Sequence, residues 1–193
     1  MRWIMVLLIA MGVGLAQHGG HNMAQHTQHN MGMQSMSTLE RLSGKNFDIA
    51  YMSMMIDHHK GAVEMSEAAL KVSKDERIRK AAQEIIAVQN EEIAQLTGWL
   101  KSWYQTTPNR LYMQMMRSDM KGMMDKASQA ISKGSADRGF LEGMIPHHQD
   151  AVDMSGPCVK KAAKPELKAF CQTVIEVQAA EIKQFQEWLK TLN

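Results

Sequence analysis

The chain has 193 residues, with 22 Lys and Arg against 20 Asp and Glu, and a formal net charge of +2 at pH 7. Because the two signs are interspersed, the sequence has neither the basic stripe of a nucleic-acid-binding protein nor an acidic solvating tail. Its unusual feature is sulfur, since it contains 19 methionines but only 2 cysteines. Methionine fills irregular cores readily, so the sequence has to indicate which methionines do more than pack.

The start of the chain, residues 1–16, has the pattern of a secretory signal peptide. Arg2 precedes an apolar run from Trp3 to Leu15, and Gly14-Leu15-Ala16 places small residues at the −3 and −1 positions of a cleavage site. The run is too short to span a bilayer, which takes about 20 residues. We therefore predict an exported protein, periplasmic or extracellular, with no membrane span once the signal peptide is cleaved.

The next segment, residues 17–36, consists mostly of Gly, Gln, Asn, His and Met and has no apolar period. It cannot bury enough apolar surface to fold alone, so we predict that it is disordered. Short His-rich tracts also indicate metal binding, and the alternative is a solvated linker. The candidate ligands in this tail are His18, His21, His26, His29, Met31, Met33 and Met36.

Two amphipathic helices follow the tail. Ser37-Thr38-Leu39-Glu40 has the form of a capping box and predicts a short helical turn. Apolar residues then recur at helical spacing from Asn46 to about Val72. A second capping box, Ser73-Lys74-Asp75-Glu76, predicts a helix that ends at Thr106-Thr107-Pro108. The connection between the two long helices is short, so we expect them to be antiparallel neighbours.

A third long helix, Leu111 to Ile131, carries a methionine stripe. Such a stripe at helical spacing usually packs in a core, but Met115 and Met124 lie off it and packing explains them poorly. A fourth helix is expected from Ala136 to about Ser155, ended by Gly156-Pro157. Pro146 lies inside that helix and should bend it just before a pair of histidines. The last helix begins at Pro165.

The chain repeats itself with an offset of 89 residues from His58 to His147. Met55-Ile56-Asp57-His58-His59 returns as Met144-Ile145-Pro146-His147-His148, and Gln89 and Glu92 return as Gln178 and Glu181. Such a repeat means that one supersecondary unit is used twice. The repeat units are 45–104 and 134–193, with a connecting helix at 109–132.

We predict an all-α fold, a ferritin-like four-helix bundle built from two repeated antiparallel helical hairpins with a Met-rich crossover helix. It would form a single domain over residues 37–193. The alternative is that hairpins from two chains build the bundle together.

Cys158 and Cys171 both lie on inward stripes of their helices. In an exported protein we expect them to form a disulfide that stabilises the hairpin by roughly 3 kcal/mol, and free buried thiols are the alternative. In two antiparallel helices, the residue numbers of facing positions add up to a constant. Pairing Cys158 with Cys171 makes that sum 329. The register then places His148 opposite Glu181 and, through the repeat, His59 opposite Glu92.

Imidazole and thioether groups suit copper or silver, because Met is a soft ligand for Cu(I) and His serves both copper oxidation states. The glutamates would either bind the ion or orient the imidazoles. The candidate interior ligands are Met55, His58, His59, Met65 and Glu92 in the first unit and Met144, His147, His148, Met154 and Glu181 in the second.

Three other interpretations stay open. The His and Glu residues could form a structural core network, in a non-catalytic bundle that binds another exported protein. They could also fix the packing while metal binds elsewhere. A ferritin-like metal oxidase needs Glu-x-x-His twice, which the chain lacks, and no nucleophile stands beside a base. We therefore predict that the protein is not an enzyme.

The motif Asp48-x-x-Tyr51-x-x-x-Met55-Ile56-x-His58-His59-x-x-Ala62, followed by Gln89-x-x-Glu92, resembles the exported family known as domain of unknown function 305. The resemblance covers about Phe47 to the C-terminus. It implies a ferritin-like helical bundle, and some members are periplasmic copper-binding proteins associated with copper tolerance. One departure is Asp57, which stands where Pro146 stands in the second unit. We therefore expect the first unit to lack the bend and its histidine pair to sit differently.

Together these patterns predict an exported protein that sequesters or carries copper, as Cu(I) or with Ag(I) in its place, in metal tolerance. Copper is the expected bound ion and is not required for folding. The expected partners are metal ions and another exported metal-handling protein.

Overall fold

The structure is a computed structural model that describes residues 33–192. The predicted signal peptide and the tail residues before Met33 lie outside the described residues. Every regular element of the described part is helical, which confirms the predicted all-α class. The helices are α1 (Met33–Arg41), α2 (Gly44–Val72), α3 (Glu76–Tyr104), α4 (Arg110–Ser132), α5 (Ala136–Lys161) and α6 (Pro165–Thr191).

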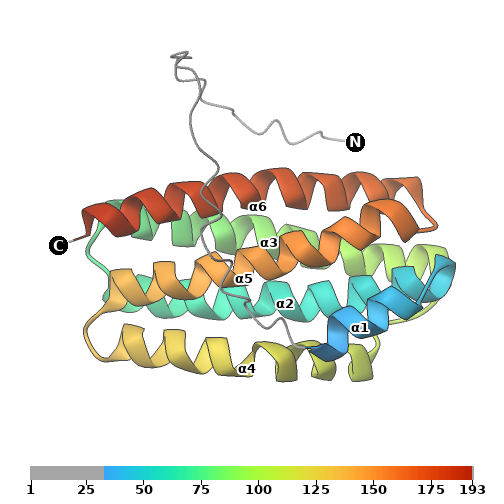
Figure 1. Ribbon diagram of the computed structural model, residues 1–193, viewed down its shortest axis with the longest axis horizontal. Helices are drawn as coiled ribbons and strands as arrows, with labels where there is room; N and C mark the ends of the chain where they lie inside the picture. The colour runs from blue at the N-terminus through green and yellow to red at the C-terminus, as the bar shows by residue number, and fades with distance from the viewer. Residues whose placement is uncertain (1–32, 193) are drawn as a thin grey trace, which may run out of the picture.

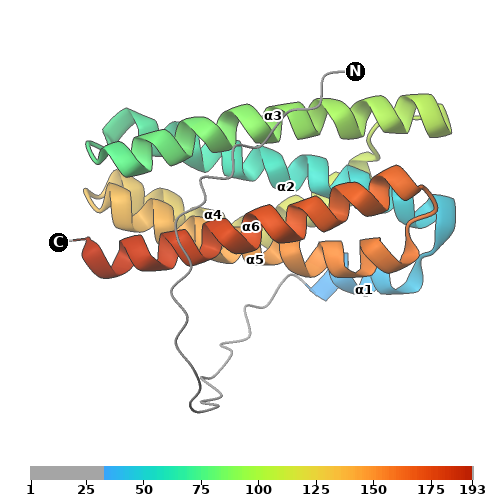
Figure 2. The ribbon, with the colours of Figure 1, turned by 90° about the horizontal axis from the view of Figure 1, so that it is seen from above.

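The helices form three layers (Figure 1). α2 and α5 pack on each other in the middle, α6 and α3 cover one side, and α4 lies on the opposite side against both central helices. α2 with α3, and α5 with α6, are the two hairpins of the repeat (Figure 2). The bundle with its Met-rich crossover helix is therefore confirmed, and one chain supplies all four helices of the two hairpins.

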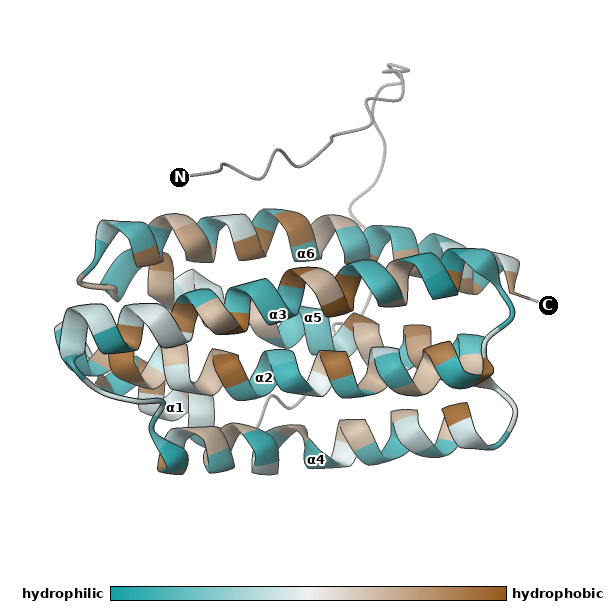
Figure 3. Ribbon diagram, turned by 180° about the vertical axis from the view of Figure 1, so that it is seen from behind, coloured by the Kyte–Doolittle hydropathy of each residue, from teal (hydrophilic) through white to brown (hydrophobic). Residues whose placement is uncertain are grey.

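The buried side chains form two apolar clusters, one toward each end of the bundle. The first contains Phe47, Tyr51 and Cys171, and the second contains Ile78, Phe140 and Phe185. Figure 3 shows hydrophilic and hydrophobic residues alternating along α2. On this helix the first cluster ends at Ile56 and the second begins at Ala62, so the apolar packing is interrupted between them. The interruption falls at the predicted histidine pairs.

Three helix boundaries differ from the sequence prediction. α1 begins at Met33, so the last residues of the segment predicted to be disordered are helical, and Ser37 lies inside the helix instead of capping it. Asp75, and not Ser73, caps α3, because its side chain accepts a hydrogen bond from the backbone of Arg77. A capping box is recognised in a sequence by residue spacing alone, and in this helix Asp75, the residue closer to the first turn, is the N-cap.

The third difference is that α5 continues through Gly156-Pro157 to Lys161, although this dipeptide was predicted to end it. An interior proline costs a helix about 3 kcal/mol. Tertiary contacts offset that cost, because Cys158 is fully buried and forms the predicted disulfide with Cys171 of α6. The disulfide is thus confirmed, and it holds the helix in register beyond the proline.

Two glycines of α5 let α4 approach closely. A Cβ added to Gly143 would lie 2.5 Å from the Cβ of Ala127, and one added to Gly139 would lie 2.9 Å from the backbone nitrogen of Ile131. Real Cβ atoms do not come so near to neighbouring atoms, so any larger residue would push α4 outward. The distance of α4 from the central layer therefore depends on these glycines.

We predict opposite effects for two Gly→Ala substitutions. Gly143→Ala should lower the free energy of unfolding by about 1–3 kcal/mol, because overpacking forces α4 away from α5. Gly98→Ala in α3 meets nothing within 4 Å and should raise it by roughly 0.5–1 kcal/mol through helix propensity. Urea unfolding followed by circular dichroism measures both changes in the free energy of unfolding. If the two changes had the same sign, the close approach of α4 to α5 at Gly143 would be contradicted.

Candidate metal centre

A layer of polar side chains divides the two apolar clusters at mid-height of the bundle, and we call it the polar layer. Each of the four hairpin helices contributes two of its members, and the imidazoles and amides are at most 4% exposed. The polar layer consists of His58 and His59 from α2, Gln89 and Glu92 from α3, His147 and His148 from α5, and Gln178 and Glu181 from α6.

The outer histidine of each pair contacts a glutamate on the neighbouring helix. The Nε2 atom of His59 lies 2.9 Å from Oε2 of Glu92, and Nε2 of His148 lies 2.9 Å from Oε2 of Glu181. The register set by the disulfide is therefore confirmed. The approach is off the N–H direction, so these are close polar contacts without hydrogen-bond geometry. The glutamates remain partly exposed, at 19% and 31% of their side-chain surface, whereas both imidazoles are fully buried.

The inner histidines meet at the centre of the layer. The rings of His58 and His147 lie 3.8 Å apart between centroids, tilted by 36°. Nε2 of His147 lies 3.1 Å from the carbonyl oxygen of His58. A carbonyl can only accept, so this nitrogen carries the proton and donates it. The lone pair of His147 then resides on Nδ1, which has no hydrogen-bond partner in the described part of the chain.

The two inner imidazoles are held neutral. Burial, the largest cause, lowers the pKa of His58 well below its ordinary value, and the neighbouring histidines lower it further. Burial likewise lowers the pKa of His147, with His148 and His59 adding to the effect. Neutral imidazole is the form that binds metal ions.

The polar layer also holds most of the unsatisfied buried atoms. Within the described residues, eleven buried side-chain nitrogen and oxygen atoms lack a hydrogen-bond partner, and nine of them belong to this layer. They include both ring nitrogens of His58 and the amide oxygens of Gln89 and Gln178. Native proteins rarely leave buried polar groups unpaired, so this concentration marks a place that suits a ligand from outside the chain.

The methionines predicted to accompany the histidines lie in the apolar clusters. Met55 and Met154 belong to the first cluster, and Met65 and Met144 belong to the second. In the tail, Met36 packs against the first cluster, and the tail histidines and Met31 lie outside the described residues. The structure thus separates these thioethers along the bundle instead of gathering them in one place.

Two methionines of α4, which the sequence reasoning had not included as ligands, approach the same glycine of α2 as the imidazole of His147 does. The position that a Cβ on Gly61 would occupy lies 3.1 Å from Nε2 of His147 and 3.5 Å from both Sδ of Met124 and Cε of Met120. Met115 and Met124 lie off the methionine stripe predicted for α4, but Met115 packs against the first apolar cluster and Met124 against both, so the expectation that packing explains them poorly is wrong. Their position off the stripe was the available signal.

Asp57 explains the difference between the two units. Its Oδ2 lies 3.0 Å from Nε of Arg117 on α4, and the same guanidinium binds Glu64 at 3.0 Å. The expectation that the first histidine pair sits differently is confirmed only for the inner histidines. Each outer histidine lies 2.9 Å from its glutamate, whereas Nε2 of His147 donates to the carbonyl of His58 and both ring nitrogens of His58 lack a partner in the described residues. Asp57 replaces the proline because this face of α2 binds α4 through charge.

The nitrogen and oxygen donors alone do not converge on one point. Among residues 33–192, no group of three or more His, Cys, Asp and Glu side chains lies close enough to hold one metal ion. An ion in the polar layer therefore needs a thioether donor, a water molecule or a change of imidazole rotamer to complete its coordination. The donor set at the centre, neutral imidazoles beside thioethers, fits a soft ion that accepts low coordination numbers.

The chain matches the protein-family model described as domain of unknown function (DUF305), over residues 10–96 and again over 48–189. It is similar to the solved structure of CopM in the Cu(I)-bound form, with 30% sequence identity and a TM-score of 0.62 over 75% of this chain and 96% of that one. CopM has also been solved in Cu(II)-bound and Ag-bound forms.

A second similar structure is that of a DUF305 protein of Streptomyces coelicolor described as secreted. It is 26% identical, with a TM-score of 0.63 over 75% of this chain and 92% of that one. No curated protein matches the chain. Between residues 33 and 192, no helix has the length and apolarity needed to cross a membrane.

We predict that acidification destabilises the metal-free protein. Because the pKa of His58 and of His147 is lowered on folding, the unfolded chain takes up protons that the folded one excludes. Stability is therefore retained above about pH 6.5 and falls below it, by about 1.4 kcal/mol per pH unit for each ring. Urea unfolding in the presence of a chelator, across about pH 5 to 8, measures the slope. His147→Asn should make it shallower, and an unchanged slope would contradict the assignment.

Proposed function

The chain belongs to the DUF305 family, and we propose that it is an exported protein that binds copper as Cu(I), with Ag(I) as an equivalent ion, to sequester or carry it. The observation that carries this proposal is the polar layer, where buried neutral imidazoles meet with unpaired ring nitrogens. The similarity to CopM, solved with copper and with silver, supports the choice of ion.

The inner histidines are the proposed ligands. His58 offers either ring nitrogen, and His147 offers Nδ1, since its Nε2 donates to a carbonyl. Met124 and Met120, which approach Gly61 from α4, are the proposed soft donors for an ion held by His58. Cu(I) favours such nitrogen and sulfur donors at low coordination number. The bound ion is cargo, so we propose binding without catalysis.

The outer histidines and glutamates have a supporting role in this proposal. Glu92 and Glu181 orient His59 and His148 and place negative charge at the rim of the layer. Residues that orient metal-binding imidazoles usually matter for affinity even when they do not touch the ion. The partial exposure of both glutamates also gives an incoming ion a polar point of contact at the surface.

A second candidate function is a non-catalytic bundle that binds another exported protein. The His–Glu contacts favour it, because they place a carboxylate beside each outer imidazole without a metal, and the described nitrogen and oxygen donors do not converge on one point. Under this alternative the imidazoles only specify packing, and copper would bind weakly or only to the tail.

We predict that His58→Asn combined with His147→Asn weakens Cu(I) binding at the interior site by more than about 100-fold, because both imidazole ligands are lost. Competition titration against a Cu(I) chelator gives affinity and stoichiometry. Deletion of residues 17–32 tests the tail separately and should leave the interior ion in place. If the double variant binds as the unsubstituted protein does, the structural role of the layer is favoured instead.

We also predict that Glu181→Gln weakens Cu(I) binding by about 10–100-fold, since the amide orients His148 less firmly than the carboxylate does. Glu187→Gln is the matched control, because Glu187 lies on the same helix but pairs with Lys190 at the surface. The same chelator competition measures both variants. Equal affinities would show that the glutamate contact serves packing alone.

A further inference from the structure

A small cavity of about 50 Å³ lies between α3 and α6, and four residues of the polar layer line it. Its lining includes Val88, Gln89 and Glu92 from α3 and Val177, Gln178 and Glu181 from α6. Every residue that lines it from α3 has its equivalent from α6 through the 89-residue repeat. The cavity, which we call the α3–α6 cavity, therefore lies where the same face of the two hairpins meets.

The two amides are the unusual part of the α3–α6 cavity. Gln89 and Gln178 are only 3% and 4% exposed, and the Oε1 atom of each is buried without a hydrogen-bond partner within the described residues. A buried amide without a partner destabilises a fold, and an apolar side chain would pack at this depth without that cost. Two such amides that line one cavity indicate a polar ligand from outside the chain.

Donor atoms lead from the α3–α6 cavity to the centre of the polar layer. Glu92 and Glu181 stand at its partly exposed rim, and Nε2 of an outer histidine lies 2.9 Å from each carboxylate. The ring of each outer histidine lies 6.2 Å between centroids from the inner histidine of its pair. In the described part of the chain, the ring nitrogens of both outer histidines have no hydrogen-bond partner. An ion that leaves a carboxylate therefore meets an outer imidazole before it reaches an inner one.

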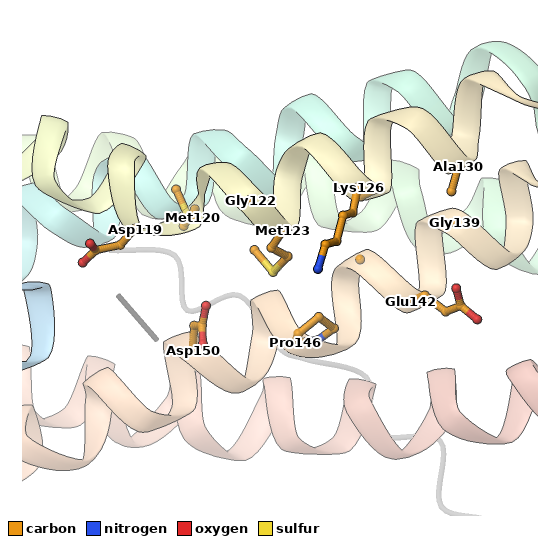
Figure 4. A pocket seen from close by; sticks show the side chains of 12 residues that line it. Asp119, Met120, Gly122, Met123, Lys126, Ala130, Gly139, Glu142, Pro146 and Asp150 are labelled. Carbon is orange, nitrogen blue, oxygen red and sulfur yellow. The ribbon is translucent and has the colours of Figure 1, made fainter. Parts of the chain in front are cut away.

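Two larger grooves of the bundle have a different lining. The groove between α4 and α5, of about 520 Å³, includes no described residue of the polar layer, and Lys126 extends from α4 toward α5 there (Figure 4). The groove between α2 and α4 likewise includes none among the described residues, and Arg117 and Lys121 line it. The described lining of the α3–α6 cavity has two carboxylates and no basic side chain. A cleft lined by one sign of charge concentrates ions of the opposite sign, so this cavity attracts cations.

We propose that the α3–α6 cavity is the entry site through which a monovalent cation reaches the inner histidines. The two amides and two carboxylates hold the partly hydrated ion briefly, and the outer histidines pass it to His58 and His147. This inference rests on the function proposed above and adds the route of the ion. Oxygen donors suit a cation that still carries water, whereas imidazoles suit a soft ion that has lost it. The order of the donors thus follows the dehydration of the ion.

Exchange of Cu(I) without oxygen tests the route on the purified full-length chain. A chase with excess Cu(I) chelator gives the dissociation rate, and this rate divided by the Kd from competition titration gives the association rate. The interior ion is the exchange phase that His58→Asn/His147→Asn lacks. Gln89→Leu combined with Gln178→Leu should slow association about 10-fold and slow dissociation as well, because both directions use one passage.

The matched control for the amides is Gln83→Leu combined with Gln172→Leu. These glutamines lie on the same two helices and are related by the same repeat, but they are exposed and do not line the cavity. The control should exchange the interior ion at the rate of the parent. A change in packing or in helix propensity alone would alter stability without slowing both directions of exchange.

A positive charge at the mouth of the α3–α6 cavity gives a second measurement. Val88 lines the cavity and is 49% exposed, so Val88→Lys keeps the core intact. It should slow association about 10-fold at low ionic strength and less at high ionic strength, because salt screens the repulsion. Val72→Lys is the matched control, since Val72 is 50% exposed but lies at the end of α2 and outside the cavity.

The outcomes separate the route from the site. If the parent binds no Cu(I) that the histidine variant loses, the proposed function fails and the route fails with it. If the parent binds that ion but both glutamine pairs exchange it equally fast, or Val88→Lys and Val72→Lys associate equally fast, the route alone is wrong and the cavity holds only water. Faster release from Gln89→Leu/Gln178→Leu would make the amides ligands and would also overturn the route. Should that variant fail to fold, the two valine variants still decide.

Discussion

The structure depends on one unfavourable arrangement, a layer of eight polar side chains, six of them buried, at mid-height of a helical bundle. Four imidazoles and two amides are nearly or fully buried there, and most of their polar atoms lack a partner within the described residues. Unpaired buried polar groups each cost about 1–3 kcal/mol, so the layer lowers stability. The apolar clusters on both sides and the disulfide between α5 and α6 offset that cost. A protein that maintains such a layer holds its ligands in place before any ion arrives.

The duplicated hairpin makes the layer symmetric, and the single α4 makes it asymmetric. Both units place an outer histidine against a glutamate at the same distance, but only α2 binds α4 by charge, through Asp57 and Arg117. On the other side, the glycines of α5 let the backbone of α4 come close. Met124 of α4 approaches Gly61 of α2, the glycine that the ring of His147 also approaches. The repeat alone would make the two histidine–glutamate units equivalent. The crossover helix α4 removes that equivalence, because its methionines approach the layer only near Gly61.

Sequence patterns predicted the features that follow from the position of a residue along its helix, namely the hairpins and their register. Helical periodicity gave the hairpins, and the cysteine pair gave the register that places Glu181 beside His148. The same patterns did not predict contacts between helices that are distant in the sequence. Met124 and His147 approach Gly61 from two other helices, and spacing along the chain does not reveal that meeting. The run of α5 through Pro157 was missed for a related reason, because a local rule for proline was outweighed by the buried disulfide on the next residue.

The buried position of the layer itself favours a monovalent ion. The cost of moving an ion out of water rises with the square of its charge, so a divalent ion costs about four times as much as a monovalent ion of similar size. Neutral imidazoles and thioethers add no charge to balance it, and Glu92 and Glu181 lie at the rim, partly in water. One charge is therefore more readily accommodated at His58 and His147 than two.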